Sequence, residues 1–200
     1  LYDETGALKE WATVDFEENN LHRHLSHLYC AWPLNETQEN SELRDACIQA
    51  IENRASENTA SHALIHRALI CARLKMRGEV SEALVGLMSN WIYYDSLMTN
   101  HNYNRSSSAY CTDFAIGYLG IINESLLFSD TGKIEILPAV PETGFESGSI
   151  KGLRARTNAL VDDVSWNLEA GTASVTVTSD ISQTVEISCG LSDKTQTVTL

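Results

Sequence analysis

The spacing of hydrophobic residues changes at about residue 132, and this change limits the possible folds more than any other feature of the sequence. Before it, apolar residues recur every three or four positions, as on one face of an amphipathic helix. After Gly132, apolar and polar residues alternate between short turn segments, which is typical of strands. The sequence therefore predicts an α+β chain of two domains, helical over residues 1–131 and with an antiparallel β domain over residues 132–200.

The same pattern predicts where the individual elements lie. The expected helices cover residues 41–55, 58–77, 79–92 and 111–128, and the expected strands cover residues 133–137, 149–156, 160–168, 173–178 and 184–189. Residues 111–128 form the most apolar of these helices, so we expect that helix to be deeply buried. Residues 99–108 are rich in Asn and Ser, which predicts a loop.

Composition and charge exclude several classes of partner. The 200 residues are 43% hydrophobic, which is too apolar for a disordered chain. The formal net charge is −13, and a surface of that sign repels nucleic-acid phosphates and anionic membranes. No apolar run approaches the roughly 18 residues that a membrane span needs. We therefore expect neither nucleic acid nor a membrane as a partner.

The cysteines and the two ends of the chain give weaker indications. The 5 cysteines have irregular spacing and no CxxC pair, so we expect small buried thiols rather than a disulfide framework. The first residue is Leu1, and residues 198–200 resemble the middle of a strand. We therefore expect the chain to be part of a longer polypeptide, with the missing part upstream.

The densest group of polar side chains lies at residues 22–27, HRHLSH. Imidazoles two and three residues apart can converge on a metal ion, but no carboxylate lies nearby in ligand spacing and Arg23 would bring a positive charge beside the ion. Hydrogen-bonded histidines at a loop-to-helix junction are a second interpretation. A third is a ligand with many hydroxyl groups, because Arg and His donate to sugar oxygens while Trp11 or Trp32 stacks on a sugar face.

Three further side chains each allow two interpretations. Asp113 opens the apolar helix, either as an N-terminal residue favoured by the helix dipole or as a buried base held against a cavity. Glu10, beside Trp11, either faces a cleft or lies on a solvated helix face. His101, in the polar loop, is either structural or functional.

A pair of histidines invites a zinc interpretation that the sequence does not support. His62 and His66 lie four residues apart on one helix face. The HExxH zinc helix needs a Glu directly after its first histidine, and Ala63 stands there instead. We therefore expect no metal at this pair.

Three segments carry a family resemblance. Residues 22–33, HRHLSHLYCAWP, are similar to an HRHxSHLYGLYPG region, residues 134–141, IEILPAVP, to an IELLPALP segment, and residues 148–156, GSIKGLRAR, to a GSVKGLRAR segment. In this order and spacing they resemble glycoside hydrolase family 95, which contains α-L-fucosidases and related α-L-galactosidases. The resemblance covers about residues 5–170 and implies the last helices of an (α/α)6 barrel followed by a C-terminal β domain.

The resemblance also implies a mechanism. The family hydrolyses with inversion, so one carboxylic acid protonates the leaving oxygen and a carboxylate on the opposite face activates water. Counting back from residues 134–138 places Asp113 on the family's general base. Arg23 and His24 match its sugar-binding Arg and His. The expected partner is an oligosaccharide, and the mechanism implies no metal and no other cofactor.

His101 matches the family's histidine just before the base loop, so it joins the predicted sugar-binding residues. Glu10 and Trp11 are predicted to line the same cleft. The general acid belongs to upstream motifs that these 200 residues lack. We therefore expect no turnover from this chain alone.

The sequence departs from the family beside the predicted base. Phe114, Ala115 and Ile116 follow Asp113 where the family has Gly, Asn and Phe. This departure motivates an alternative function, a non-catalytic carbohydrate-binding relative of the family. The resemblance suggests a glycan-degrading bacterium as the setting. It leaves open the sugar, the linkage, the oligomeric state and the compartment, whether extracellular, periplasmic or cytoplasmic.

Overall fold

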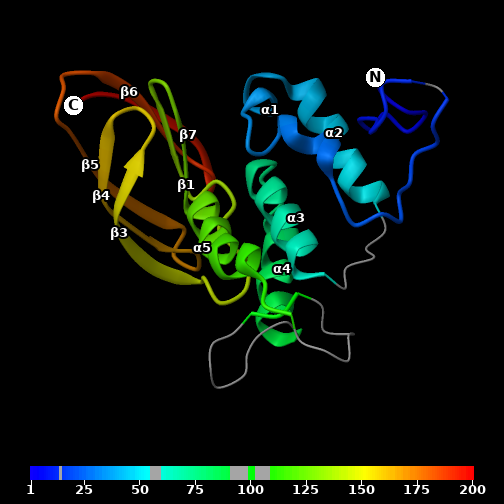
Figure 1. Ribbon diagram of the computed structural model, residues 1–200. Helices are drawn as coiled ribbons and strands as arrows, with labels where there is room; N and C mark the ends of the chain where they lie inside the picture. Colours follow the sequence, from blue (N-terminus) through cyan, green and yellow to red (C-terminus); the bar gives the residue numbers. More distant parts are fainter. Residues whose placement is uncertain (14, 55–59, 91–98, 102–108) are drawn as a thin grey trace.

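The structure, a computed structural model, describes residues 1–13, 15–54, 60–90, 99–101 and 109–200. The helical part contains η1 (Ser26–Cys30), α1 (Glu36–Glu39), α2 (Ser41–Asn53), α3 (Ser61–Arg73), α4 (Arg77–Asn90) and α5 (Thr112–Leu126). The β part contains β1 (Leu127–Asp130), β2 (Lys133–Ile136), β3 (Ser147–Ala155), β4 (Ala159–Asn167), β5 (Thr172–Ser179), β6 (Thr184–Cys189) and β7 (Ser192–Thr199). A helical part followed by a β part confirms the predicted fold class (Figure 1).

Some of the predicted elements reach beyond what the structure describes. Two groups of predicted residues lie outside the described part of the chain. They are the helix ends at residues 55, 58–59 and 91–92, and residues 102–108 of the predicted loop. The first strand, β1, begins at Leu127, before the predicted domain boundary near residue 132. The exact division into two domains stays a prediction.

Helix α3 is the central helix of the helical part. It packs against both α4 and α5, and most of its side chains, largely Ala, Leu and Ile, are buried. A helix that is apolar on nearly all sides needs neighbours on nearly all sides. Its partly exposed positions include His62, His66 and Arg67. The two histidines therefore lie where this helix reaches the surface.

Helix α5 differs from its prediction in two respects. Phe114 and Ile121 are buried, but Ile116 and Leu119 are 74% and 63% exposed. The expectation of a deeply buried helix is therefore wrong for that face, because only the opposite face packs on α3. The helix also ends at Leu126 rather than at residue 128. Among the described helices, none combines the length and the apolar character that crossing a membrane requires.

The strand that follows α5 was not predicted from the sequence. β1 runs antiparallel to β2, with Leu127 opposite Ile136 and Asp130 opposite Lys133. Its residues continue the apolar pattern of α5 without an intervening turn signal. Pairing with β2 determines the conformation here, which local sequence does not reveal.

The strands form two packed sheets. One has the order β1-β2-β6-β7 and the other the order β3-β4-β5. The domain was predicted to be antiparallel, and β2 and β6 are an exception because they pair in parallel. Parallel neighbours need a long crossover, and β3 to β5 supply it. The core between the sheets includes Ile134, Val161, Val164 and Trp166.

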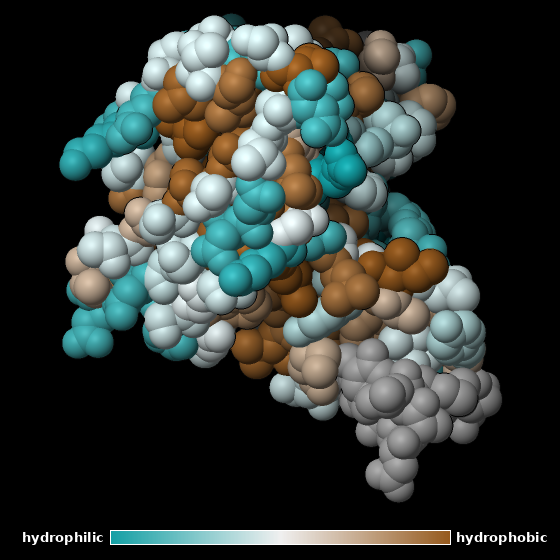
Figure 2. All heavy atoms as spheres, turned by 90° about the vertical axis from the view of Figure 1, so that its left-hand side faces the viewer, coloured by the Kyte–Doolittle hydropathy of each residue, from teal (hydrophilic) through white to brown (hydrophobic). Residues whose placement is uncertain are grey.

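The outer surface of the β part keeps some apolar area. Figure 2, which faces this side of the molecule, shows hydrophobic surface between polar and charged side chains. Val175 on β5 and Ile187 on β6 line a groove of about 500 Å³ where the two sheets separate. Exposed apolar area of this extent is usual for globular proteins.

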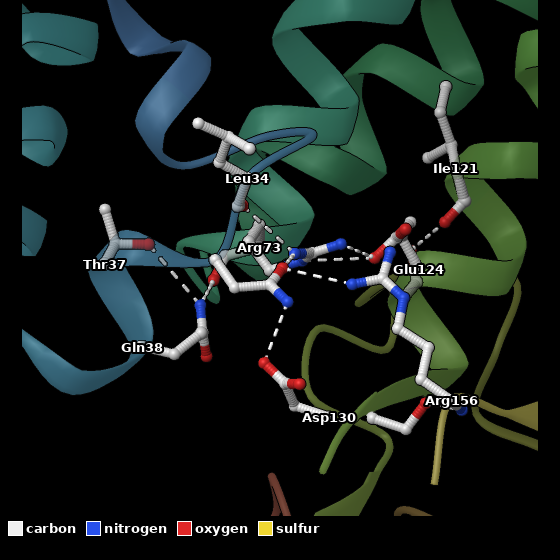
Figure 3. A network of polar contacts seen from close by, with 11 residues as sticks. Leu34, Thr37, Gln38, Arg73, Ile121, Glu124, Asp130 and Arg156 are labelled. Atoms are coloured by element: carbon white, nitrogen blue, oxygen red, sulfur yellow. Dashed lines mark hydrogen bonds and ion pairs between the residues drawn. The ribbon is translucent and has the colours of Figure 1, made fainter. Parts of the chain in front are cut away.

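A buried network of polar contacts joins the helical part to the β part (Figure 3). The Arg73 guanidinium, 2% exposed, donates from Nη2 to Glu124 Oε2 of α5 at 2.6 Å. It also donates to the Leu34 carbonyl and to Asn35 Oδ1. The Asn35 amide donates to Asp130 Oδ2 of β1 at 2.9 Å. The packing of the two parts therefore depends on paired charge as well as on apolar contact.

The close approach of α3 and α5 depends on Gly117. A methyl group at this position would lie 2.4 Å from Ile65 Cγ2, whereas at Gly120 it would lie 3.6 Å from Leu69 Cδ2. Gly117→Ala is therefore expected to lower the free energy of unfolding by about 1–3 kcal/mol through overpacking. Gly120→Ala is the matched control and should be neutral, or stabilising by up to about 1 kcal/mol through helix propensity. Urea unfolding of both variants measures this, and equal effects at the two glycines would contradict the assignment.

Candidate active site

The largest described cavity lies between the segment before η1, helix α3 and the start of α5. It has a volume of about 720 Å³. Its lining includes His24, Leu25, Ser26, Trp32, His62, Ile65, His66, Leu69, Thr112, Asp113, Ile116 and Gly117. Apolar and polar groups thus share one cavity, which suits a ligand that has both hydroxyl groups and C–H surface.

Helical spacing explains how the cavity walls form. His62, Ile65, His66 and Leu69 follow one another at steps of three and four along α3, so they share one face. The start of α5 meets that face, since Gly117 permits contact with Ile65. The cavity wall is thus a consequence of the packing between α3 and α5.

Asp113 lies in the first turn of α5, at the mouth of the cavity. Its side chain is 61% exposed, and its Oδ2 atom lies 3.8 Å from His62 Nδ1. Cys111 Sγ lies 3.9 Å from the same oxygen. A carboxylate in the first helical turn is favoured by the helix dipole, and water reaches it from the open side. This position suits a group that takes a proton from water.

A row of histidines runs along the polar wall. The ring centroids of His22 and His24 are 5.0 Å apart, those of His24 and His62 are 5.7 Å apart, and those of His62 and His66 are 6.4 Å apart. Burial lowers the pKa of His24, and the positive charge of Arg23 lowers it further. His24 therefore favours its neutral form, which can both donate and accept hydrogen bonds. The same holds for His66, because burial lowers its pKa too.

His66 packs edge-on against Trp32, with ring centroids 5.8 Å apart. Burial lowers the pKa of His66 to about 4, with further lowering by His62 and His24. Trp32 lines the cavity too, so this pair offers an aromatic face beside hydrogen-bonding nitrogen atoms. Such a combination is common where proteins hold sugars, because one face of a sugar ring is apolar.

The pKa of His66 predicts a pH dependence of stability. An unfolded histidine takes up its proton near pH 6.5 and folded His66 only near pH 4, so acidification favours the unfolded chain. Between pH 7 and pH 5 we expect His66 to remove about 2 kcal/mol from the free energy of unfolding. His66→Gln cannot take up a proton and should remove this part of the loss. Urea unfolding at both pH values checks it, and equal losses in variant and wild type would be the contrary result.

The structure places Glu10 behind the cavity wall rather than in its lining. Its carboxylate accepts from Arg54 Nη2 at 3.3 Å and from Ser26 Oγ at 3.4 Å. Arg54, itself buried, also donates to the carbonyls of Asn19 and His22. Glu10 thus helps to anchor the segment that carries the histidines, as a buried ion pair with several hydrogen bonds does.

Trp11, Arg23 and His101 also lie outside the described cavity lining. Trp11 is 43% exposed and packs edge-on against Phe16. Arg23 is adjacent to His24 in the sequence and acts on it through its charge. The His101 carbonyl accepts from the Ser61 amide at 2.9 Å, so this residue holds the start of α3. Of the predicted site residues, the structure brings Asp113 and His24 together in one cavity.

Sequence reasoning did not place His62 and His66 in the site. Their spacing of four residues was considered only as a zinc motif. Within the described part of the chain, no group of three or more His, Cys, Asp or Glu side chains is arranged to hold a metal ion. The signal that could have found them is the run of buried Ala, Leu and Ile residues in α3, because two polar rings spaced four residues apart in such a helix indicate a face that is not packed in the core.

Comparison with known proteins agrees with this fold. Residues 2–126 match the profile of the glycosyl hydrolase family 95 catalytic domain, and residues 128–199 match the profile of the glycoside hydrolase family 95 C-terminal domain. The helical part and its cavity are thus part of a glycoside hydrolase catalytic domain. This chain belongs to glycoside hydrolase family 95, and the predicted resemblance is confirmed.

Two curated relatives carry fucosidase names. The chain is 28% identical to Alpha-L-fucosidase 2 of Arabidopsis thaliana over 174 residues, which are 80% of this chain and 20% of that protein. It is also 28% identical to Probable alpha-fucosidase A of Aspergillus oryzae over 186 residues, 82% of this chain and 25% of that protein. The chain therefore spans about a fifth to a quarter of the length of these relatives.

Proposed function

We propose that this chain forms the Asp113 side of the active site of an inverting glycoside hydrolase that removes a terminal α-L-fucosyl or closely related residue from an oligosaccharide. The observation that carries the proposal is the position of Asp113. Its carboxylate lies at the open mouth of a cavity of about 720 Å³ that is lined by both imidazoles and aliphatic side chains. The fucosidase names of the two relatives support the choice of sugar.

In this mechanism Asp113 is the general base. The Asp113 carboxylate takes a proton from a water molecule while the water oxygen attacks the anomeric carbon. A carboxylic acid on the opposite side gives its proton to the leaving oxygen, so the glycosidic bond breaks and the configuration inverts. The general acid is proposed to come from residues beyond these 200, since the aligned part of this chain covers only 20% and 25% of the two relatives.

The remaining predicted residues are assigned to sugar binding. His24 lines the cavity and is proposed to hold hydroxyl groups directly, together with Arg23, its neighbour in the sequence. Glu10, Trp11 and His101 are proposed to act at the edge of the same site. The backbone contact of His101 and the ion pair of Glu10 would also fix the walls on which the sugar rests.

The experiment that tests the proposal uses a polypeptide that contains this chain together with the rest of the catalytic domain. It is offered aryl α-L-fucosides, α-L-galactosides and fucosylated oligosaccharides, and proton NMR follows the anomer that is released first. Initial release of the β-anomer supports the inverting mechanism, whereas initial release of the α-anomer contradicts it. The 200-residue chain alone is the control and should release no sugar.

The same experiment distinguishes hydrolysis from the alternative function, which is carbohydrate binding without catalysis. Phe114 and Ile116, next to Asp113, differ from the family's usual residues, and Ile116 is largely exposed. A folded protein that binds the sugars in calorimetry but hydrolyses none of them would support a non-catalytic carbohydrate-binding relative and overturn the proposal.

A further inference from the structure

We propose that His62 is a positioning residue for Asp113, holding one carboxylate oxygen so that the other is free to take the proton of the attacking water. This inference rests on the proposed function, in which Asp113 is the general base. It concerns His62, which the sequence analysis considered only as a zinc ligand and rejected in that role.

The contact joins the first turns of two packed helices. His62 is the second residue of α3, and Asp113 is the second residue of α5. The distance from His62 Nδ1 to Asp113 Oδ2 is 3.8 Å, somewhat longer than a hydrogen bond. Catalytic hydrogen bonds commonly tighten when substrate binds. Both side chains line the same cavity.

The backbone on both sides holds this geometry. The His101 carbonyl accepts from the backbone amide and the hydroxyl of Ser61, directly before His62. Gly117 allows α5 to approach Ile65, one turn further along α3. The two side chains are therefore held near each other by elements that are themselves packed, which is what a positioning role requires.

The other charged groups around His62 do not compete for the carboxylate. His66 on α3 and His24 from the segment before η1 face His62, and burial lowers the pKa of both. They stay neutral near pH 7, and the charge of Arg23 lowers the pKa of His24 further. Among the described residues, His62 is the basic side chain that lies within 4 Å of the Asp113 carboxylate, and the Cys111 thiol, 3.9 Å from the same oxygen, is a weaker donor.

The role moves no proton on His62 itself. Its Nδ1–H donates to Asp113 Oδ2 throughout the reaction. The proton of the water goes to Oδ1 of Asp113, and the proton for the leaving oxygen comes from the general acid. A donor held on one oxygen fixes the plane of the carboxylate.

The test compares His62→Ala and His62→Asn in the full-length protein, because the Asn side-chain amide takes nearly the place of Nδ1–H. We expect His62→Ala to lower kcat by about tenfold to a hundredfold with little change in KM, and His62→Asn to recover most of that loss. Recovery by His62→Asn separates a positioning role from a merely structural one. Lys151→Ala is the control, because this exposed cation pairs with Asp163 on the β part, and it should leave kcat and KM unchanged.

A second measurement does not depend on activity. In the 200-residue chain, ¹⁵N NMR of the His62 ring should show a change at Nδ1 when Asp113 is replaced by Asn. An unchanged Nδ1 signal, or His62→Ala with the wild-type kcat, overturns the inference.

Asp113→Asn in the full-length protein separates this outcome from failure of the proposed function. If Asp113→Asn is inactive while His62→Ala behaves as wild type, only the role of His62 is refuted. If Asp113→Asn keeps the wild-type rate, the proposed function fails as well.

Discussion

Replacing Asp113 by Asn in a polypeptide that contains this chain together with the rest of the catalytic domain is expected to lower kcat by about 10² to 10⁴-fold, the contribution usual for a general base. Asn has the same shape but cannot accept the proton of the attacking water. Sugar affinity should change little, because the cavity walls that hold the ring come from α3 and from the segment before η1. Steady-state kinetics on an aryl α-L-fucoside and calorimetry with the free sugar measure the two quantities.

The control for this variant is Asp193→Asn, an equivalent change at an exposed position of β7. It should leave both the rate and the affinity unchanged. Asp113→Ala with added formate offers a sharper check, because the truncated side chain leaves room for a small anion to act as the base, and the rate should rise with the formate concentration. If the Asp113→Asn variant turns over substrate as fast as wild type, Asp113 is not the general base.

The second large effect concerns stability. Arg73→Leu is expected to lower the free energy of unfolding by about 3–5 kcal/mol, because it leaves Glu124 without its cation in a largely buried site. Arg73 is 2% exposed and Glu124 is 20% exposed. For a chain of this size the loss corresponds to a decrease in Tm of roughly 10 °C. Thermal and urea unfolding of the 200-residue chain measure it.

Two further variants test whether the loss comes from burial of the Arg73–Glu124 pair rather than from removal of any ion pair. Lys151→Ala removes an exposed cation, 77% exposed and 3.3 Å from Asp163, and should cost no more than about 1 kcal/mol. The double variant Arg73→Leu/Glu124→Leu removes both charges and should recover part of the loss. If Lys151→Ala and Arg73→Leu destabilise the chain equally, burial of the pair is not the cause.

The sequence predicted the order of elements well, because each long element has its own hydrophobic period. Helices α2 and α5 and strands β3 to β6 lie within a few residues of their predicted ranges. It failed where pairing or packing decides the outcome. β1 is a strand because β2 lies beside it, and Leu119 is exposed although it belongs to the most apolar helix.

The candidate site shows the same limit. The sequence pointed to Asp113 because this residue opens an apolar helix and lies at the expected distance before the family motif at residues 134–138. His62 was not placed beside it, because nothing local links the two residues across 50 positions of sequence. Only the packing of α3 on α5, which Gly117 permits, brings them together. The family resemblance pointed to Asp113 as the proposed base, and the three-dimensional structure shows that His62 lies beside it.

Asn35 has a consequence of its own, which follows from the two unlike ends of an amide. Its oxygen accepts from Arg73 and Arg156, while its nitrogen donates to Asp130. The side chain therefore links two cations, Arg73 of α3 and Arg156 directly after β3, to an anion of β1. An Asp in its place would suit the arginines but repel Asp130, and a Leu would satisfy neither. This junction thus requires a neutral side chain that accepts hydrogen bonds at one atom and donates them at another.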